Sequence, residues 1–270
     1  MKTFFKVDGV EITDERFFLI AGPCVIEDEG LTLEIATEAK KIAGELGIPY
    51  IFKASFDKAN RTAYSSPRGP GIAKGLPILA RIKEEVGVPV LSDIHEPWQA
   101  QQAAAVLSVI QIPAFLSRQT DLLVAAARTG LPLNIKKSQM MSPADVALAV
   151  GKVSEAGNRR VMLTERGTFF GYNNLVVDFR SIPLMKESGC PVVMDATHAV
   201  QRPSGANGVS GGDPRFIPLL ASAGIVAGAN GVFLEIHPDP AKALSDGANS
   251  LPLASLRALL VRLQKLYNVA

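Results

Sequence analysis

Short apolar runs alternate along the chain with longer segments of helical character. The apolar runs are rich in Val, Ile, Leu and Phe and lack strict alternation of apolar and polar positions. Strands buried on both faces of a parallel sheet have this pattern. The chain is therefore predicted to contain eight such strands, at Phe17–Ala21, Pro49–Ala54, Val88–Ile94, Val109–Pro113, Leu131–Lys136, Val161–Glu165, Pro191–Asp195 and Gly231–Ile236.

Helical patterns follow each of these runs. They are predicted at Leu31–Leu46, Ile72–Val86, Pro97–Val106, Asp121–Thr129, Pro143–Ala156, Ile182–Ser188, Phe216–Ala223 and Leu251–Tyr267. Ser142 offers a hydroxyl N-cap to the fifth helix, with Pro143 in its first turn and Asp145 near the positive end of its dipole. Gly130 and Gly157 stand where C-terminal glycines end helices.

Before the first strand, Phe4–Val7 and Val10–Ile12 flank Asp8-Gly9, a dipeptide typical of tight hairpin turns. Eight strand–helix units in 270 residues match a (β/α)₈ TIM barrel. We therefore predict an α/β fold with one barrel domain over residues 1–270 and a short β-hairpin within residues 1–14. A doubly wound open sheet is the competitor, but its glycine-rich turn normally follows the first strand, whereas the glycines of Arg68–Gly71 follow the second.

Composition limits the classes of function. A hydrophobic content of 47% with 20% charged residues is ordinary for a globular protein. The net charge of +2 lacks the basic excess of nucleic-acid binders. Cys24 and Cys190 are too few for a disulfide framework and indicate a reducing, cytoplasmic compartment. No signal peptide and no membrane-spanning run is visible, so no membrane partner is expected.

The stretch Phe52–Gly71 is predicted to bind anions. It places Lys53, Lys58, Arg61 and Arg68 among hydroxyl and amide side chains that include Ser55, Asn60 and Thr62. Phosphate oxygens accept charge-assisted hydrogen bonds from several directions, which such a cluster supplies. A solvated basic loop is the alternative, but this stretch begins where a strand ends and its Pro and Gly residues fix turns.

Reactive side chains fall at the predicted carboxyl ends of the strands, where barrel enzymes carry their chemistry. All three histidines lie there, and cations follow several strands. The residues at these ends are Cys24, Lys53, Asp93, His95, Gln111, Arg118, Lys136, Lys137, Glu165, Arg166, Asp195, His198, Glu235 and His237. Lys53, Lys58, Arg61, Lys136 and Arg166 are expected to converge as unpaired positive charge, which favours a substrate with several negative charges.

Cys24, His198 and Glu235 would come from adjacent strands of a closed barrel, with Asp246 in the loop after the last strand. Together they could coordinate one divalent transition metal. The alternative is that Cys24 is a small buried residue and His198 a hydrogen-bonded core residue; Cys190 is expected to be structural. The glycine- and proline-rich segment Gln201–Arg215 is either a lid or a simple connection.

Long motifs resemble the 3-deoxy-D-manno-octulosonate 8-phosphate synthase family. They are KASFDKANR, RGPG, SDIHEP, QIPAFLSRQTDLL, NIKKSQ, TERGTFFGYNNLVVDFRS, MDATHAVQ and EIHPDPAKALSDG, and the resemblance runs from about Phe17 to the C-terminus. It implies a (β/α)₈ barrel, usually a homotetramer. It also implies condensation of phosphoenolpyruvate with D-arabinose 5-phosphate, releasing phosphate, on the pathway to the inner core of lipopolysaccharide.

The resemblance also implies roles for individual residues. Phosphoenolpyruvate would be held by Lys58, Gln111, Ala114, Lys136 and Arg166. The sugar phosphate would be held by Lys53, Asn60, Arg61 and Thr62, with Arg118 reaching in from a neighbouring subunit. Ser55 and Asp93, within KASFDKANR and SDIHEP, complete the predicted substrate site. The family motif usually has serine at the position of Thr62, so a hydroxyl is retained.

One branch of the family has asparagine at the position of Cys24 and needs no metal; the other has a GPC motif and binds a divalent ion. The motif AGPCVIE resembles the second branch. It implies Cys24, His198, Glu235 and Asp246 as ligands of one divalent transition metal per subunit. A thiolate among nitrogen and oxygen ligands favours Zn²⁺ or Fe²⁺, with Mn²⁺ as a further candidate.

The implied reaction is an aldol-type addition in which Lys136 and Arg166 stabilise the departing phosphate and His198 and Asp246 are candidates for proton transfer to water. Three rivals remain open. They are the related synthase that uses erythrose 4-phosphate, a Schiff-base aldolase with Lys136 or Lys53 as nucleophile, and a barrel that binds sugar phosphates without catalysis. The erythrose enzyme typically carries a KPRTS-like motif where this chain has KANRT.

Overall fold

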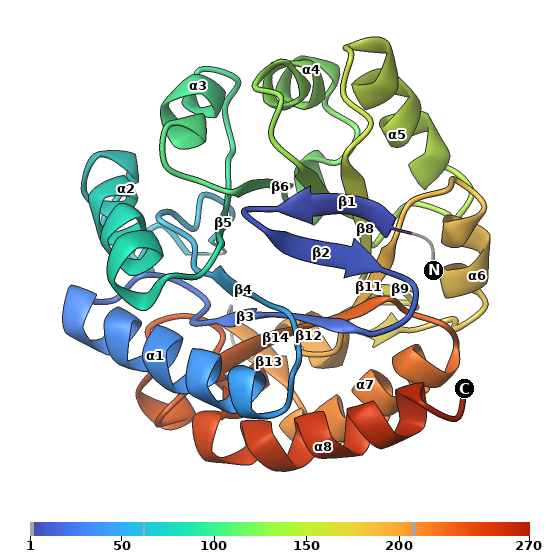
Figure 1. The fold of residues 1–270 in the computed structure, drawn as a ribbon. Helices are drawn as coiled ribbons and strands as arrows, with labels where there is room; N and C mark the ends of the chain where they lie inside the picture. The colour runs from blue at the N-terminus through green and yellow to red at the C-terminus, as the bar shows by residue number, and fades with distance from the viewer. Residues whose placement is uncertain (1–2, 62, 207–208) are drawn as a thin grey trace.

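Eight parallel strands form the closed barrel that the apolar runs predict (Figure 1). The structure is a computed structural model and describes residues 3–61, 63–206 and 209–270. Parallel pairing of the last strand with both the seventh and the first closes the sheet. The barrel strands are β3 (Phe18–Gly22), β4 (Tyr50–Lys53), β5 (Val90–Asp93), β6 (Val109–Ile112), β7 (Leu133–Lys136), β8 (Val161–Glu165), β11 (Val192–Asp195) and β14 (Gly231–His237).

In the described part of the chain, eight α-helices surround the barrel, as predicted (Figure 1). They are α1 (Glu29–Glu45), α2 (Ile72–Arg81), α3 (Gln99–Ala104), α4 (Thr120–Arg128), α5 (Val146–Glu155), α6 (Ser181–Lys186), α7 (Ile217–Val226) and α8 (Leu256–Tyr267). A π-helical turn, Ile82–Val86, extends α2. Short 3₁₀ turns span Ala114–Leu116, His198–Val200, Pro214–Phe216, Pro240–Lys242, Gly247–Asn249 and Leu253–Ser255.

Helix α5 begins later than its sequence signal predicts. The Ser142 hydroxyl accepts a hydrogen bond from the Asp145 amide at 3.2 Å, so the predicted cap is made. It closes a turn over residues 143–145, and the α-helix begins at Val146. The two helix-ending glycines were predicted correctly, since Gly130 and Gly157 have φ of 75° and 94°.

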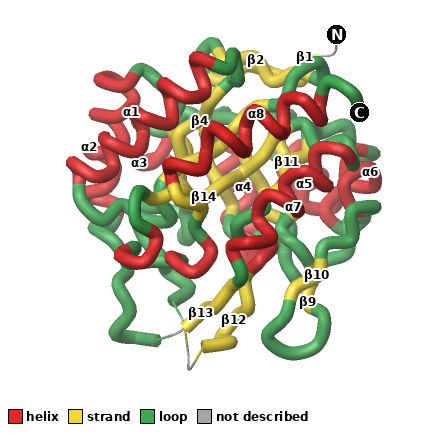
Figure 2. The backbone as a smooth tube through the Cα atoms, turned by 90° about the horizontal axis from the view of Figure 1, so that it is seen from below, coloured by secondary structure: helices red, strands yellow, loops and turns green. Residues whose placement is uncertain are grey.

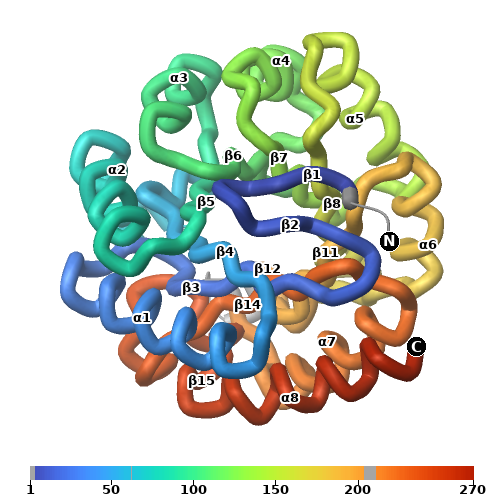
Figure 3. Tube along the Cα trace, in the orientation of Figure 1, coloured from blue at the N-terminus to red at the C-terminus, as the bar shows by residue number. Residues whose placement is uncertain are grey.

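The predicted N-terminal hairpin closes one end of the barrel. Strands β1 (Thr3–Val7) and β2 (Val10–Thr13) lie across the barrel axis (Figure 3). Asp8 and Gly9 both have positive φ, 44° and 85°, as a primed turn requires. Phe5, Val7 and Ile12 join the inward side chains of the barrel, among them Phe18 and Phe233, in one buried cluster. The hairpin therefore seals the interior at the amino ends of the strands.

The opposite end of the barrel carries the functional loops. Along each barrel strand one set of side chains fills the interior, while the alternate set, such as Leu19 and Phe52, packs in the cluster formed with the helices. This double burial explains why the strands lack a polar alternation. Four further strands, β9 (Thr168–Phe169), β10 (Leu175–Val176), β12 (Gln201–Ala206) and β13 (Val209–Gly212), form two hairpins that project away from β1 and β2 (Figure 2).

The segment predicted as a lid is thus largely a β-hairpin, and its residues 207 and 208 lie outside the described residues. Whether it opens and closes stays a prediction. Strand β15 (Leu251–Pro252) adds a short parallel pair to β14. Among the described residues, no helix has both the length and the apolar character needed to cross a bilayer.

Candidate active site

A cavity of about 390 Å³ opens at the carboxyl ends of the barrel strands. Most of the predicted site residues line it, namely Lys53, Lys58, Asn60, Arg61, Asp93, Gln111, Ala114, Lys136, Arg166, His198 and Asp246. Cys24 and Glu235 are buried beside it. The strand register accounts for this convergence. It sets Asp93 opposite Gln111 and Glu235 opposite Gly22, so the carboxyl ends of neighbouring strands lie at the same height along the barrel axis.

Among the described residues, two predicted substrate residues, Ser55 and Arg118, do not line the cavity. Ser55 is buried and donates a hydrogen bond to the Asp93 carboxylate at 2.5 Å, so it positions a lining residue. Arg118 is exposed, and its backbone carbonyl accepts a hydrogen bond from Lys152. Thr62 lies outside the described residues. The role of Arg118 in a neighbouring subunit stays a prediction.

The expectation that the converging cations are unpaired is wrong for the lysines. The ammonium of Lys53 lies 3.2 Å from Glu235 Oε1 and donates to the Cys24 carbonyl at 2.9 Å. The ammonium of Lys136 lies 2.7 Å from Asp195 Oδ2. Buried charges are stable only when they are paired, and the barrel supplies the acids from other strand ends.

The two arginines of the cavity differ from the lysines. Arg166 donates to Gln201 Oε1 and to the His198 carbonyl, and Arg61 donates to Ser245 Oγ at 2.8 Å. All of these acceptors are uncharged. Among the described residues, Arg166 Nη1 and Arg61 Nε have no hydrogen-bond partner although both atoms are buried. The cavity is therefore lined by two guanidinium groups whose hydrogen-bond acceptors among the described residues are uncharged, which suits two phosphate or carboxylate groups.

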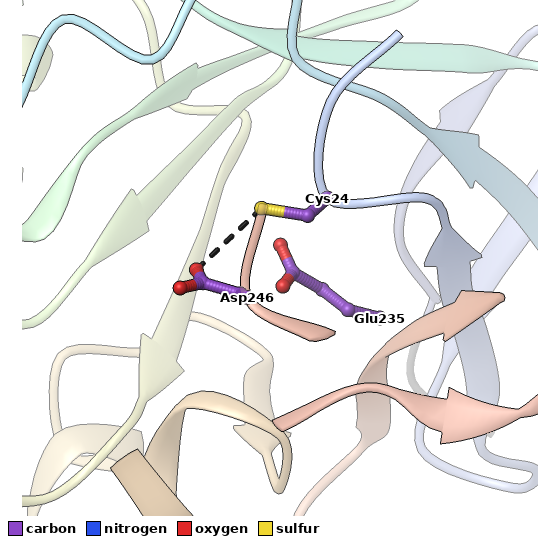
Figure 4. Close-up of side chains that lie close together, drawn as sticks. All are labelled: Cys24, Glu235 and Asp246. Carbon is purple, nitrogen blue, oxygen red and sulfur yellow. Dashed lines mark hydrogen bonds between the residues drawn. The ribbon is translucent and has the colours of Figure 1, made fainter. Parts of the chain in front are cut away.

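A second cluster, formed by Cys24, Glu235 and Asp246, can hold a metal ion (Figure 4). One ligand atom from each lies within 4.8 Å of the other two. His198 Nε2 faces the same cluster, 3.4 Å from Glu235 Oε1 and 3.9 Å from Asp246 Oδ2. The pairings of β14 with β11 and β3 explain this approach, since they make the strands that carry these residues neighbours.

The donor set fits a divalent transition metal. Glu235 Oε2 is buried without a hydrogen-bond partner among the described residues, so it has an oxygen to offer. Asp246 has a left-handed backbone with φ of 50°, an uncommon conformation that is concentrated at functional positions. Thiolate, imidazole and carboxylate together suit Zn²⁺ or Fe²⁺ better than Mg²⁺.

Charge within the site is tightly balanced. Burial and the neighbouring Glu235 raise the pKa of the Cys24 thiol, so this cysteine needs a cation to become a thiolate. Burial opposes ionisation of Glu235, but His198, Lys53 and Lys58 outweigh it and lower its pKa to about 2. For Lys58, burial is likewise outweighed by the surrounding acidic groups, which raise its pKa.

The cavity floor is ordered by a polar ladder across three strands. Gln111 donates to Asn134 Oδ1 at 2.7 Å, and Asn134 donates to Thr164 Oγ1 at 2.7 Å. Each of these side chains is buried, so the ladder satisfies groups that would otherwise be costly in the interior. It holds Gln111 in one orientation toward the cavity.

Gln201 and Ser245 were missed as site residues, and Asp195 was noted only as a residue at a strand end. Gln201 connects two site residues, because it accepts from Arg166 and donates to Asp246 Oδ2 at 3.2 Å. Ser245 lies 3.0 Å from the Cys24 sulfur and also accepts from Arg61. The only sequence signal for Gln201 and Ser245 was their place in motifs that contain His198 and Asp246.

Comparison with known proteins identifies close relatives. Residues 6–269 match the model of the DAHP synthetase I family. The chain is 58% identical over 251 residues to the 2-dehydro-3-deoxyphosphooctonate aldolase of Desulfotalea psychrophila, covering 93% of this chain and 90% of the relative. Proteins of the same name from Koribacter versatilis and Syntrophobacter fumaroxidans are 56% and 52% identical, each over 265 residues. These matches cover 97% and 98% of this chain, and 95% and 92% of the respective relatives.

Proposed function

The chain belongs to the DAHP synthetase I family, and from that membership we propose that it condenses phosphoenolpyruvate with D-arabinose 5-phosphate and water. The products are 3-deoxy-D-manno-octulosonate 8-phosphate and inorganic phosphate, in the biosynthesis of the lipopolysaccharide inner core. The relatives' name, 2-dehydro-3-deoxyphosphooctonate aldolase, supports the eight-carbon product. The observation that carries the proposal is the pair of guanidinium groups, Arg61 and Arg166, with free donors at one cavity.

The two arginines divide the substrates between them. Arg166, with Lys136 and Lys58, would hold the phosphate and carboxylate of phosphoenolpyruvate, with Gln111 and Ala114 beside them. Arg61, with Lys53, Asn60 and Thr62, would hold the sugar phosphate. All of these except Thr62, which lies outside the described residues, line the cavity.

The reaction forms one carbon–carbon bond and breaks one carbon–oxygen bond. The methylene carbon of phosphoenolpyruvate attacks the sugar aldehyde, whose oxygen takes up a proton. Water adds to the resulting cationic carbon and loses a proton, which a carboxylate oxygen of Asp246 would accept; His198 would take this role only in metal-free protein, because a bound metal uses the electron pair of Nε2. The hemiketal phosphate then releases phosphate by cleavage of its carbon–oxygen bond, while Lys136 and Arg166 stabilise the departing charge.

Cys24, His198, Glu235 and Asp246 would hold one divalent transition metal, Zn²⁺ or Fe²⁺ in the first place and Mn²⁺ as a further candidate. Such an ion supplies Lewis-acid polarisation of the aldehyde or a bound water of lowered pKa. The approach of three of these ligand atoms to within 4.8 Å supports the assignment, as does the position of His198 Nε2 beside them.

We also propose a cytoplasmic homotetramer. Exposure of Arg118 outside the cavity is consistent with a role in a neighbour's site, and the exposed aromatic residues Phe115, Phe170 and Tyr172 could pack at a subunit contact. Among the described residues, the buried Cys24 and Cys190 form no disulfide, which agrees with a reducing compartment.

One observation favours a Schiff-base aldolase as the second candidate. Burial lowers the pKa of Lys136, and a lysine of lowered pKa can act as a nucleophile. The ion pair with Asp195 opposes this role, because it keeps the amine charged. Borohydride added with substrate would reduce a Schiff base on Lys136 to a stable covalent adduct. The proposed mechanism forms no Schiff base, so it predicts no adduct.

The decisive experiment measures phosphate release from phosphoenolpyruvate with separate five-carbon and four-carbon aldose phosphates. We expect release with arabinose 5-phosphate and little with erythrose 4-phosphate, and we expect exhaustive chelation to abolish it. Preference for the four-carbon sugar would assign the related heptulosonate synthase activity. Absence of release with any aldose, in protein that binds sugar phosphates, would indicate a binding protein.

A further inference from the structure

Asp195, at the end of β11, connects the two halves of the site. Its side chain is fully buried, and four donors converge on its two oxygens. Oδ2 lies 2.6 Å from His198 Nδ1 and 2.7 Å from Lys136 Nζ. Oδ1 accepts from the Thr197 hydroxyl at 3.0 Å and from the His198 amide at 2.9 Å. The proposed catalytic steps use none of these contacts directly.

The contact with Oδ2 fixes the orientation of the His198 ring. An ionised carboxylate only accepts hydrogen bonds, and its Oδ2 is the nearer neighbour of Nδ1; the ammonium of Lys136, 3.3 Å from Nδ1, donates to the same Oδ2 at 2.7 Å. Nδ1 must therefore carry a hydrogen and donate it to Asp195. The free electron pair then belongs to Nε2, which faces Glu235 and Asp246. A carboxylate behind a histidine ligand is known to fix its tautomer and raise its affinity for metal.

The same oxygen positions the ammonium of Lys136. Nζ lies 3.9 Å from the centroid of the Phe233 ring, and among the described residues Asp195 is its one acidic partner within 4.0 Å. The other oxygen extends the network to a third strand, because Thr197 Oγ1 also accepts from the Glu235 amide at 3.1 Å. One carboxylate thus ties together the ends of β7, β11 and β14.

We propose that Asp195 is a positioning residue that couples the metal-binding face of His198 to the phosphate-binding ammonium of Lys136. This inference rests on the proposed function for the identity of the two ligands. An asparagine at this position keeps the shape but carries no negative charge, and its NH2 group would face hydrogen-bond donors at whichever of the two oxygen positions it took. It therefore cannot satisfy all four donors, so both ligands are expected to bind more weakly.

The test compares Asp195→Asn with the unaltered protein in two binding measurements. Competition with a chromogenic chelator gives the Kd for Zn²⁺, and calorimetry on metal-free protein gives the Kd for phosphoenolpyruvate. We expect Zn²⁺ to bind about 10- to 100-fold more weakly. We expect phosphoenolpyruvate to bind about tenfold more weakly, because the buried ammonium loses its charged partner.

Glu165→Gln is the matched control. Glu165 is a buried carboxylate at the end of the adjacent strand β8, and its partner is Lys137, the residue next to Lys136. This variant should leave the Zn²⁺ affinity unchanged. If Glu165→Gln weakened the binding of both Zn²⁺ and phosphoenolpyruvate, loss of any buried carboxylate near the site would explain the result, and the inference would be overturned.

In folded Asp195→Asn, loss of one affinity without the other would also overturn the coupling. If that variant does not fold, Thr197→Val removes one donor from Oδ1 and should weaken Zn²⁺ binding several-fold; unchanged binding would count against the inference. Phosphate release is not a readout here. Protein that binds both ligands but makes no octulosonate would refute the proposed function alone, whereas unaltered protein that binds neither would refute both.

Discussion

The guanidinium of Arg61 provides a sharp test of which substrate lies where. It donates to Ser245 Oγ at 2.8 Å and to the Leu244 carbonyl at 3.5 Å, and its buried Nε has no partner among the described residues. The group therefore has a donor to spare, and its side chain lines the cavity proposed for the sugar phosphate. Lysine at this position keeps the charge but cannot donate two parallel hydrogen bonds to one phosphate group, as a guanidinium can.

The expected loss follows from the number of contacts removed. A hydrogen bond to a charged group contributes about 1.5–3 kcal/mol, and each 1.4 kcal/mol is about tenfold in affinity. Arg61→Lys should therefore raise the Kd for arabinose 5-phosphate by about 10- to 150-fold. Phosphoenolpyruvate keeps Lys136 and Arg166, so its Kd should change by less than about twofold.

Calorimetric titration of each substrate separately measures both constants. Arg68→Lys is the control, because Arg68 lies in the same loop but is paired with Asp57 at the surface and does not line the cavity. It should leave both affinities unchanged. Equal losses for the two substrates in Arg61→Lys would refute the assignment of Arg61 to the sugar phosphate.

Three further predictions address the metal, the assembly and the fold. Cys24→Ser should lower metal content and turnover together, whereas Cys24→Asn should retain chelator-resistant turnover; full activity of the unaltered protein after verified metal removal would contradict both expectations. Mixing Arg118→Ala subunits with subunits inactivated at Lys136 should restore activity in hybrids, and no recovery despite proven subunit exchange would place Arg118 outside a neighbour's site. Ile12→Ala, in the fully buried hairpin cluster, should lower the free energy of unfolding by about 2–5 kcal/mol in denaturant titration. A change below 1 kcal/mol would show that the hairpin contributes little to stability.

Local chemistry made the fold predictable from the sequence. The apolar runs became strands because both faces are buried, and Asp8-Gly9 became a turn because only such residues tolerate positive φ at both positions. The start of α5 was predicted early, since a serine that caps a turn and one that caps a helix have the same local sequence. A capping residue in the sequence predicts a hydrogen bond to a backbone amide. It does not determine whether an α-helix or a single turn follows.

The site was predictable only in part. The barrel rule brings strand ends together, so lining residues such as Lys53, Gln111 and Arg166 followed from their position, whereas Ala114 followed only from the family resemblance. The partner of each charge did not follow. Lys53 pairs with Glu235 and Lys136 with Asp195 across strands far apart in sequence, and the expectation of unpaired lysines failed there. Pairing depends on side-chain reach across the closed barrel, which the strand pattern does not encode.

The closing of the barrel by β14 also has a consequence for how the chain folds during synthesis. The first barrel strand, β3, pairs with β14, and the hairpin cluster is complete only when Phe233 joins Phe5 and Ile12. The ribosome synthesises the chain from its N-terminus, so β1, β2 and β3 emerge first. Their apolar faces stay partly uncovered until β14 has been synthesised. A partly made chain therefore exposes an open sheet edge and an unfinished interior, the surfaces that chaperones bind and that aggregate when left free.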